Sequence, residues 1–248
     1  MGLAITFALV ATRMAAFVAV SPFPGPMVPT NIRVGFVLLL AVAATPLAGV
    51  QHIAIGPQLV VAAMGEAVTG AAVALIFRIG MSAAEVLGST LAHATGLTFA
   101  SSYDPTQSAT TDALTRIVSN AAVLVAFAVG AHRLVIGAAV TSVRMVPVGG
   151  MTDLATYVPG MLSWTARTME CGVGLAVPAM TVSLVVQVAL GLVARAAPAL
   201  QIFSIGLAVS LASGLVVILS GMRDSLSGIA THLTGLGGVL ERVLAPAG

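Results

Sequence analysis

The sequence predicts an all-α fold, that of a membrane-complex protein built of long, broken apolar helical hairpins. Hydrophobic residues make up 58% of the chain and charged residues only 7%, whereas a soluble domain carries roughly 25% charged residues. Several apolar stretches approach the roughly 20 residues that a helix needs to cross a bilayer. Prolines and glycines separate these stretches. No repeat period or linker divides the chain, so residues 1–248 are expected to form one helical domain.

The first part of the chain predicts two helices around a proline-rich break. Gly2–Val20 is apolar and is interrupted only by Arg13. It has no basic segment before its apolar run, so it is expected to be retained as the first helix rather than cleaved as a signal peptide. Residues 21–29 contain four prolines and cannot be helical. A second helix is expected in the apolar stretch over residues 34–50, ending near Pro46, and a break follows at residues 51–57.

Residues 58–100 form an apolar segment with two unusual features. It carries four ionisable groups, each costly to place at a bilayer centre: Glu66, Arg78, Glu85 and His93. Small residues also recur at every fourth position and so share one helix face. Such a stripe lets two helix backbones approach closely. The predicted helix-packing residues are Gly80, Ala84, Gly88, Ala92, Gly96 and Ala100.

The remaining chain alternates loops and apolar helices. Residues 101–111 are the most polar segment, and a helix is expected over residues 117–132, extending in both directions and past Arg133. Residues 147–159 are expected to form a loop, and residues 171–194 and 196–222 to form two charge-free helices. Residues 223–248 have a weak amphipathic pattern and are expected to form a C-terminal tail along a surface.

Several function classes are excluded by what the chain lacks. Its ten basic residues are all arginines, scattered singly against eight acids, so no basic stripe indicates nucleic acid. The single Cys171 excludes an internal disulfide and a cysteine metal cluster. The common protease, hydrolase and nucleotide-binding motifs are absent, and the histidines lie far apart in sequence. We therefore expect no catalytic residue, no metal and no cofactor.

The embedded charges leave two interpretations open. Glu66 or Glu85 could be the coupling carboxylate of a multi-pass secondary transporter. Alternatively, these acids form structural ion pairs with Arg78, which lies seven residues from Glu85. Arginines within or beside apolar stretches, such as Arg13, do not follow the loop pattern of a simple membrane bundle. We therefore expect partner subunits, rather than lipid alone, to cover much of the apolar surface.

Three stretches resemble the FliR/SctT family of type III secretion export-gate proteins. Residues 22–29 (PFPGPMVP) with 33–35 (RVG) are similar to the early proline-rich break of that family. Residues 96–100 (GLTFA) with 103–105 (YDP) resemble its central signature, and residues 190–198 (LGLVARAAP) with 202–206 (IFSIG) its later one. The order and spacing of these stretches agree over nearly the whole chain.

The resemblance implies a non-enzymatic structural and gating subunit of a protein-export channel. It implies P-type and Q-type export-gate subunits as hetero-oligomeric partners, together with the B-type export component, unfolded export substrates and membrane lipid. It also implies a bacterial inner-membrane location, and a flagellar basal body rather than an injectisome, because flagella are more widespread. By position, the residues of the pore plug would be Phe99, Tyr103, Asp104, Pro105 and Gln107.

Overall fold

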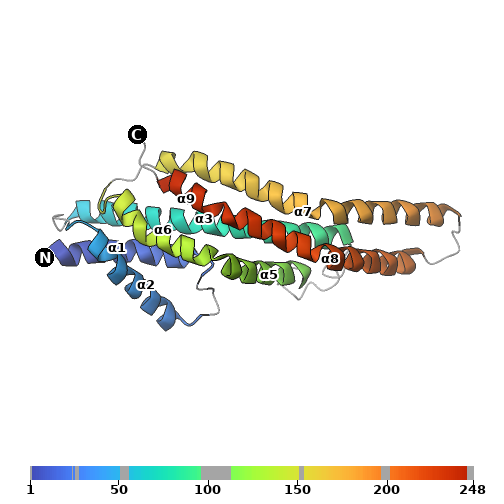
Figure 1. The fold of residues 1–248 in the computed structure, drawn as a ribbon, viewed down its shortest axis with the longest axis horizontal. Helices are drawn as coiled ribbons and strands as arrows, with labels where there is room; N and C mark the ends of the chain where they lie inside the picture. Colours follow the sequence, from blue (N-terminus) through green and yellow to red (C-terminus); the bar gives the residue numbers. More distant parts are fainter. Residues whose placement is uncertain are drawn as a thin grey trace. The chain divides into compact units, whose positions relative to one another are not determined.

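The computed structural model describes residues 2–23, 25, 28–50, 56–95, 113–150, 154–196 and 202–244, and every regular element within these ranges is helical (Figure 1). The predicted all-α class is confirmed. Five of the described helices are long and apolar enough to cross a membrane, or six spans result if α5 (Ala113–Val129) and α6 (Ala131–Met145) are counted as one broken span.

The chain divides into two compact units, each assembled from separate segments. Unit 1 comprises Met1–Gly80, Gly130–Ala166 and Thr234–Gly248, and unit 2 comprises Met81–Val129 and Arg167–Leu233. Two long helices, α3 (Pro57–Thr95) and α7 (Leu154–Ala196), contribute residues to both units. The expectation of a single domain stays a prediction.

Unit 1 is organised around helix α1 (Gly2–Val20), which follows the predicted first helix from end to end. α1 packs against α2 (Thr30–Ala44), which continues into the short helix η1 (Thr45–Leu47). The buried residues of α1 recur at intervals of three and four and so form one stripe: Thr6, Leu9, Val10, Arg13, Met14, Phe17 and Val18. The opposite side of α1 is exposed although it is also apolar, as at Ala8 and Ala15.

The C-terminal segment of unit 1 differs from the predicted weakly amphipathic tail. Residues 236–244 form the helix α9 (Leu236–Leu244), which packs against α6. Its buried residues follow the i, i+3, i+4, i+7 spacing of an amphipathic helix: Leu236, Val239, Leu240 and Val243. The short length of this pattern, within a glycine-rich segment, made it weak in the sequence.

Unit 2 contains the second part of α3, all of α5, most of α7, and α8 (Ile202–Thr234) except its last residue. Glycines mark the closest approaches between these helices. A Cβ atom added at Gly88 would lie 2.7 Å from the Cα of Thr115 in α5, and one added at Gly172 would lie 2.8 Å from the carbonyl oxygen of Ala83 in α3. Only residues without a side chain permit these backbone distances.

α2 begins at Thr30 and not at residue 34 as predicted, and three further predicted boundaries were wrong. The helix expected over residues 117–132 is broken at Gly130, which adopts a left-handed φ of 79°, and the chain continues past Arg133 only as the separate helix α6. The expected loop at 147–159 ends early, since α7 begins at residue 154 and includes Pro159. Packing of the buried Tyr157 side chain in unit 1 stabilises this turn of α7 and offsets the free energy of the hydrogen bond that proline cannot donate.

The third wrong boundary lies at the end of the last long helix. The predicted stop at residue 222 preceded the charged pair Arg223 and Asp224, but α8 continues to Thr234. Both charges lie on its exposed side, while Ile229 and Leu233 are buried on the other. An exposed charge does not end a helix whose opposite side packs in a core.

Candidate functional site

The residues predicted to plug a pore, Phe99, Tyr103, Asp104, Pro105 and Gln107, lie outside the described residues. Gly96 and Ala100, the last two predicted helix-packing positions, lie outside them as well. The structure therefore leaves the plug a prediction, and the site that can be built from described residues lies in unit 1.

The centre of that site is a buried ion pair between α1 and α3. The Nε of Arg13 donates a hydrogen bond to Oε2 of Glu66 at 2.5 Å, and both side chains are only 1% exposed. Removing these two ions from water costs several kcal/mol each, to be recovered only by good geometry and further hydrogen bonds. The other hydrogen bonds of Arg13 and Glu66 therefore determine the structural role of the ion pair.

Those contacts join the pair to α6 and to the turn at residues 146–150. Nη1 of Arg13 donates to the hydroxyl of Ser142 at 3.3 Å, and Nη2 donates to the carbonyl of Val146 at 3.0 Å. The backbone N–H of Gly149 donates to Oε1 of Glu66 at 2.8 Å. Both oxygens of the carboxylate and all three guanidinium nitrogens thus have partners.

The sequence of α3 explains why Arg13 and Glu66 meet. Gly70 lies one helical turn after Glu66 and so shares its face. A Cβ atom added at Gly70 would overlap the carbonyl of Arg13, so glycine lets α1 approach α3 at that level. Gly149 has a left-handed φ of 78°, which glycine adopts without strain. Two glycines therefore position the two backbones around the ion pair.

The predicted pairing of the acids with Arg78 was wrong. Glu66 pairs with Arg13, and Arg78 and Glu85 are both exposed on α3, without an ion pair among the described residues. Glu66 is also a poor coupling carboxylate, because both its oxygens already accept hydrogen bonds, one from the side chain of Arg13 and one from the backbone of Gly149. The isolated charges in two apolar helices were the signal for this pair, since buried ions require a partner.

The described members of the predicted small-residue stripe all face neighbouring helices. A Cβ atom at Gly80 would lie 3.1 Å from the indole ring of Trp164 in α7, within unit 1. The indole N–H donates to the carbonyl of Ile76 at 2.9 Å. In unit 2, Ala84 and Ala92 are buried and Gly88 contacts Thr115 of α5.

Helix α7 shows a division between small and large side chains that the sequence analysis missed. In unit 2 its buried stripe consists of small residues, namely Thr168, Gly172, Ala176, Ala179 and Ser183. Its large aliphatic residues point outward, among them Val173, Val177, Leu184, Val185, Val188 and Leu192. This arrangement is typical of helices that pack together in an apolar environment.

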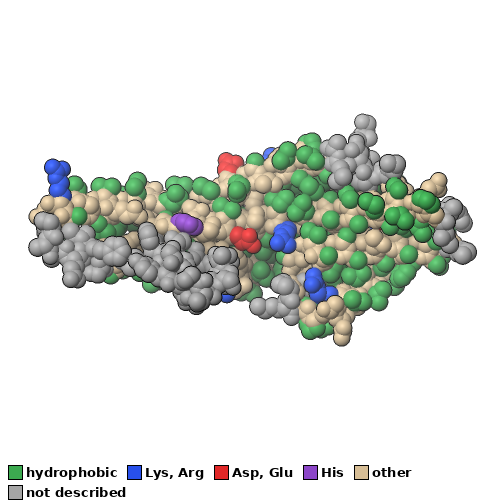
Figure 2. All heavy atoms as spheres, turned by 180° about the vertical axis from the view of Figure 1, so that it is seen from behind, with side chains coloured by type: hydrophobic (Ala, Val, Ile, Leu, Met, Phe, Trp, Pro, Cys, Tyr) green, Lys and Arg blue, Asp and Glu red, His purple; other side chains and the backbone are tan. Residues whose placement is uncertain are grey.

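Apolar side chains are exposed on other helices too. They include Ile32 and Leu39 on α2, Leu124 on α5, and Val216 and Leu219 on α8. Figure 2 shows apolar side chains spread over the described helices on the face drawn, with only isolated charged side chains among them. Such a surface is unsuited to water and requires lipid or protein to cover it.

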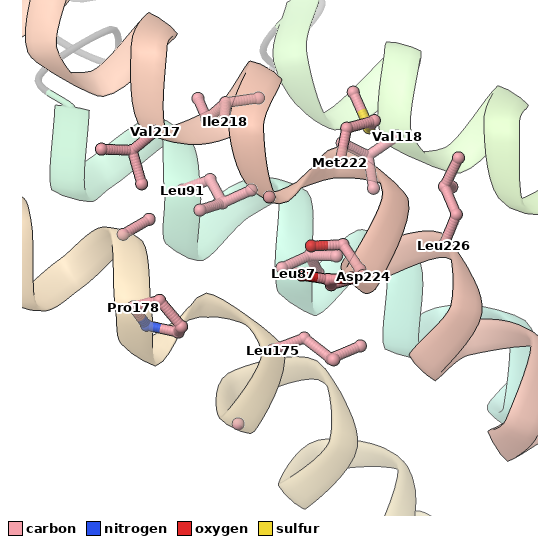
Figure 3. Close-up of a pocket in the computed structure, with 14 residues that line it drawn as sticks. Leu87, Leu91, Val118, Leu175, Pro178, Val217, Ile218, Met222, Asp224 and Leu226 are labelled. Atoms are coloured by element: carbon pink, nitrogen blue, oxygen red, sulfur yellow. The ribbon is translucent and has the colours of Figure 1, made fainter.

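A cavity of about 200 Å³ lies among the helices of unit 2 (Figure 3). Leu87 and Leu91 of α3, Leu175 and Pro178 of α7, and Met222 of α8 lie around it. Gly174 and Gly221 also line the cavity, and a Cβ atom added at either would meet nothing within 4 Å. The cavity is mainly apolar. Among the described residues, no group of three His, Cys, Asp or Glu side chains could hold a metal ion.

The long helices, the outward-facing aliphatic residues and the paired internal charges define an all-α membrane protein. The chain matches the family described as bacterial export proteins, family 1, over residues 4–235. It belongs to this family.

Similar proteins include three called flagellar biosynthetic protein FliR. The chain is 33% identical to that of Caulobacter vibrioides, over 90% of this chain and 89% of the relative. It is 23% identical to that of Escherichia coli, over 89% and 85%, and 24% identical to that of Aquifex aeolicus, over 87% and 84%. The predicted membership of the FliR/SctT family is confirmed.

Proposed function

We propose that this chain is a structural and gating subunit of the flagellar protein-export channel in the bacterial inner membrane. The observation that carries the proposal is similarity to flagellar biosynthetic proteins along nearly the whole chain, with 33% identity to the Caulobacter vibrioides protein. The subunit acts without catalysis, as a shaped part of a channel. Its substrates are unfolded export proteins, which it contacts only during passage.

The apolar exterior supports assembly with P-type and Q-type subunits. Outward-facing aliphatic residues cover the part of α7 that lies in unit 2, and a partner helix would bury them. Between apolar helices, association depends on close packing and polar contacts rather than on the hydrophobic effect. A hetero-oligomeric ring with the B-type component beside it would supply both.

Two measurements test this assignment. A host that lacks its own family member should regain motility when this chain is supplied, and the tagged chain should co-purify with the P-type and Q-type subunits. A chain that leaves the host non-motile and purifies alone as a monodisperse monomer would contradict the proposal. In that case lipid, and not protein, covers the apolar surface.

A matched pair of variants on α7 localises the interface. Leu184 is exposed and apolar, and Leu184→Arg should lower the amount of co-purified partner without lowering the level of the chain. Glu170 is also exposed on α7, and Glu170→Arg should leave co-purification unchanged. Equal losses for both variants would indicate a general effect of positive charge instead of a contact at Leu184.

The plug is a separate part of the proposal. Phe99, Tyr103, Asp104, Pro105 and Gln107 are the residues proposed to close the pore at rest. Deleting residues 102–108 should make the membrane permeable to small solutes, measured as uptake of a dye or as growth inhibition by a normally excluded compound. A membrane that stays tight, with the chain assembled at its normal level, would refute the gating role and leave the structural role intact.

A further inference from the structure

We infer that Arg13 and Glu66 are positioning residues that hold the turn at residues 146–150 in one conformation, and that protein export depends on this hold. We call Arg13, Glu66 and their contacts to the turn the turn clamp. The claim that export depends on this hold rests on the proposed function above. The hold itself is a property of unit 1 and is tested separately.

The chemistry of the contacts distinguishes the turn clamp from a simple ion pair. Arg13 donates to a backbone carbonyl at the start of the turn, that of Val146, and Glu66 accepts from a backbone N–H within it, that of Gly149. The cation therefore meets an acceptor and the anion meets a donor. This pattern fits only one placement of the two charges.

Energetics also argue that the pair does more than join α1 to α3. A buried ion pair is often no more stable than two apolar side chains of similar size. The neighbouring helix contact does not depend on the ion pair alone either, because the backbone of α1 at Arg13 lies directly against α3 at Gly70. What apolar residues cannot replace is the pair of hydrogen bonds to the turn.

The turn is a suitable element to be held in this way. It connects α6 to the segment before α7, and it makes a single internal backbone hydrogen bond, from Gly150 to the carbonyl of Pro147. Val148 at its centre is only 4% exposed. A turn with one internal bond needs outside contacts to keep one conformation, and the turn clamp supplies two.

Two double variants separate the hold from the ion pair. Arg13→Leu with Glu66→Met replaces the ions by apolar side chains of similar combined volume. Arg13→Glu with Glu66→Arg keeps an ion pair but reverses it, so that a carboxylate faces the Val146 carbonyl and a guanidinium faces the Gly149 N–H. Both variants should release the turn. The control is Trp164→Phe, which removes a buried hydrogen bond of unit 1 that does not touch the turn.

The readout of the hold is the accessibility of residue 148. Val148→Cys in a Cys171→Ala background places the sole thiol in the buried centre of the turn. In membranes from cells that contain the full export apparatus, a small maleimide should label it slowly. Labelling should become about tenfold faster or more in both double variants, since each lost hydrogen bond changes a local opening equilibrium by up to about tenfold. It should remain slow in Trp164→Phe.

Export is measured in the same cells as flagellar protein released into the medium. Both double variants should reduce release about tenfold at an unchanged level of the chain, and the control should not. Native labelling or full export in either double variant would overturn the inference. Degradation of the Leu/Met variant would also overturn it, because the pair would then hold unit 1 together. If the wild-type chain fails to support export, the proposed function is wrong. The labelling rates still show whether Arg13 and Glu66 hold the turn in one conformation.

Discussion

The sharpest test of the packing of unit 2 compares two glycines of α7 that lie two residues apart. Gly172 is buried, and a Cβ atom there would lie 2.8 Å from the carbonyl oxygen of Ala83 and 2.8 Å from the side chain of Val86. Gly174 is exposed, and a Cβ atom there would meet nothing within 4 Å. We therefore compare Gly172→Ala with Gly174→Ala.

The helix propensity of alanine is common to both variants and cancels in the comparison. Replacing glycine by alanine inside a helix favours folding by about 1 kcal/mol. At Gly174 this gain stands alone, and Gly174→Ala should be stabilising. At Gly172 the added methyl group must displace the backbone of α3, and overpacking of this kind costs about 1–3 kcal/mol. The free energies of unfolding should therefore differ by about 1–3 kcal/mol, with Gly172→Ala the less stable variant.

The assay is thermal stability of the chain purified from membranes in mild detergent. The fraction that stays in solution after heating gives a midpoint for each variant. In soluble proteins of this size, 1 kcal/mol shifts the midpoint by about 2–4 °C, so the two midpoints should differ by at least about 2 °C. Equal midpoints for the two variants, or a midpoint for Gly174→Ala below that of Gly172→Ala, would refute the close approach of α7 to α3 at Gly172.

Three further outcomes follow from other contacts. The single tryptophan, Trp164, is 3% exposed, so its fluorescence should be blue-shifted and poorly quenched by acrylamide until unit 1 unfolds. Leu236→Ala in the buried stripe of α9 should cost about 2–5 kcal/mol, and Arg242→Ala on its exposed side less than about 0.5 kcal/mol, measured as thermal midpoints. Gly130→Ala should destabilise by about 1–2 kcal/mol because of its left-handed φ, whereas Gly137→Ala, with nothing within 4 Å, should be neutral or stabilising by the same assay.

Much of the fold could be predicted from the sequence because apolar length and proline breaks dominate it. The first helix, Gly2–Val20, was predicted with its observed bounds, since the prolines that follow residue 20 cannot continue a helix. The boundary errors arose where tertiary packing decides the outcome. Pro159 reads locally as a loop residue, but α7 includes it because the surrounding turns are packed in unit 1.

The candidate site was only partly predictable. Arg13 and Glu66 were recognised as unusual charges, but their pairing joins residues 53 positions apart in sequence, and spacing along one helix favoured Arg78 instead. The hydrogen bonds from the turn at residues 146–150 had no signal at all, because a backbone N–H and a carbonyl are present at almost every position. The plug residues stay a prediction from resemblance.

The distribution of side chains explains why glycines and the turn clamp matter so much in this chain. Large aliphatic residues such as Leu184 and Leu219 are exposed, while the ion pair of Arg13 and Glu66 is buried. With lipid or apolar partners outside, burying a leucine inside the chain gains packing contacts but little from the hydrophobic effect, which alone cannot specify which helices pack together. Specificity must then come from shape, as at Gly172, and from polar contacts that have one correct partner, as between Glu66 and the Gly149 N–H. Substitutions at Gly172 should therefore disturb helix packing and substitutions at Glu66 the turn, whereas substitutions of the outward leucines should act mainly on assembly.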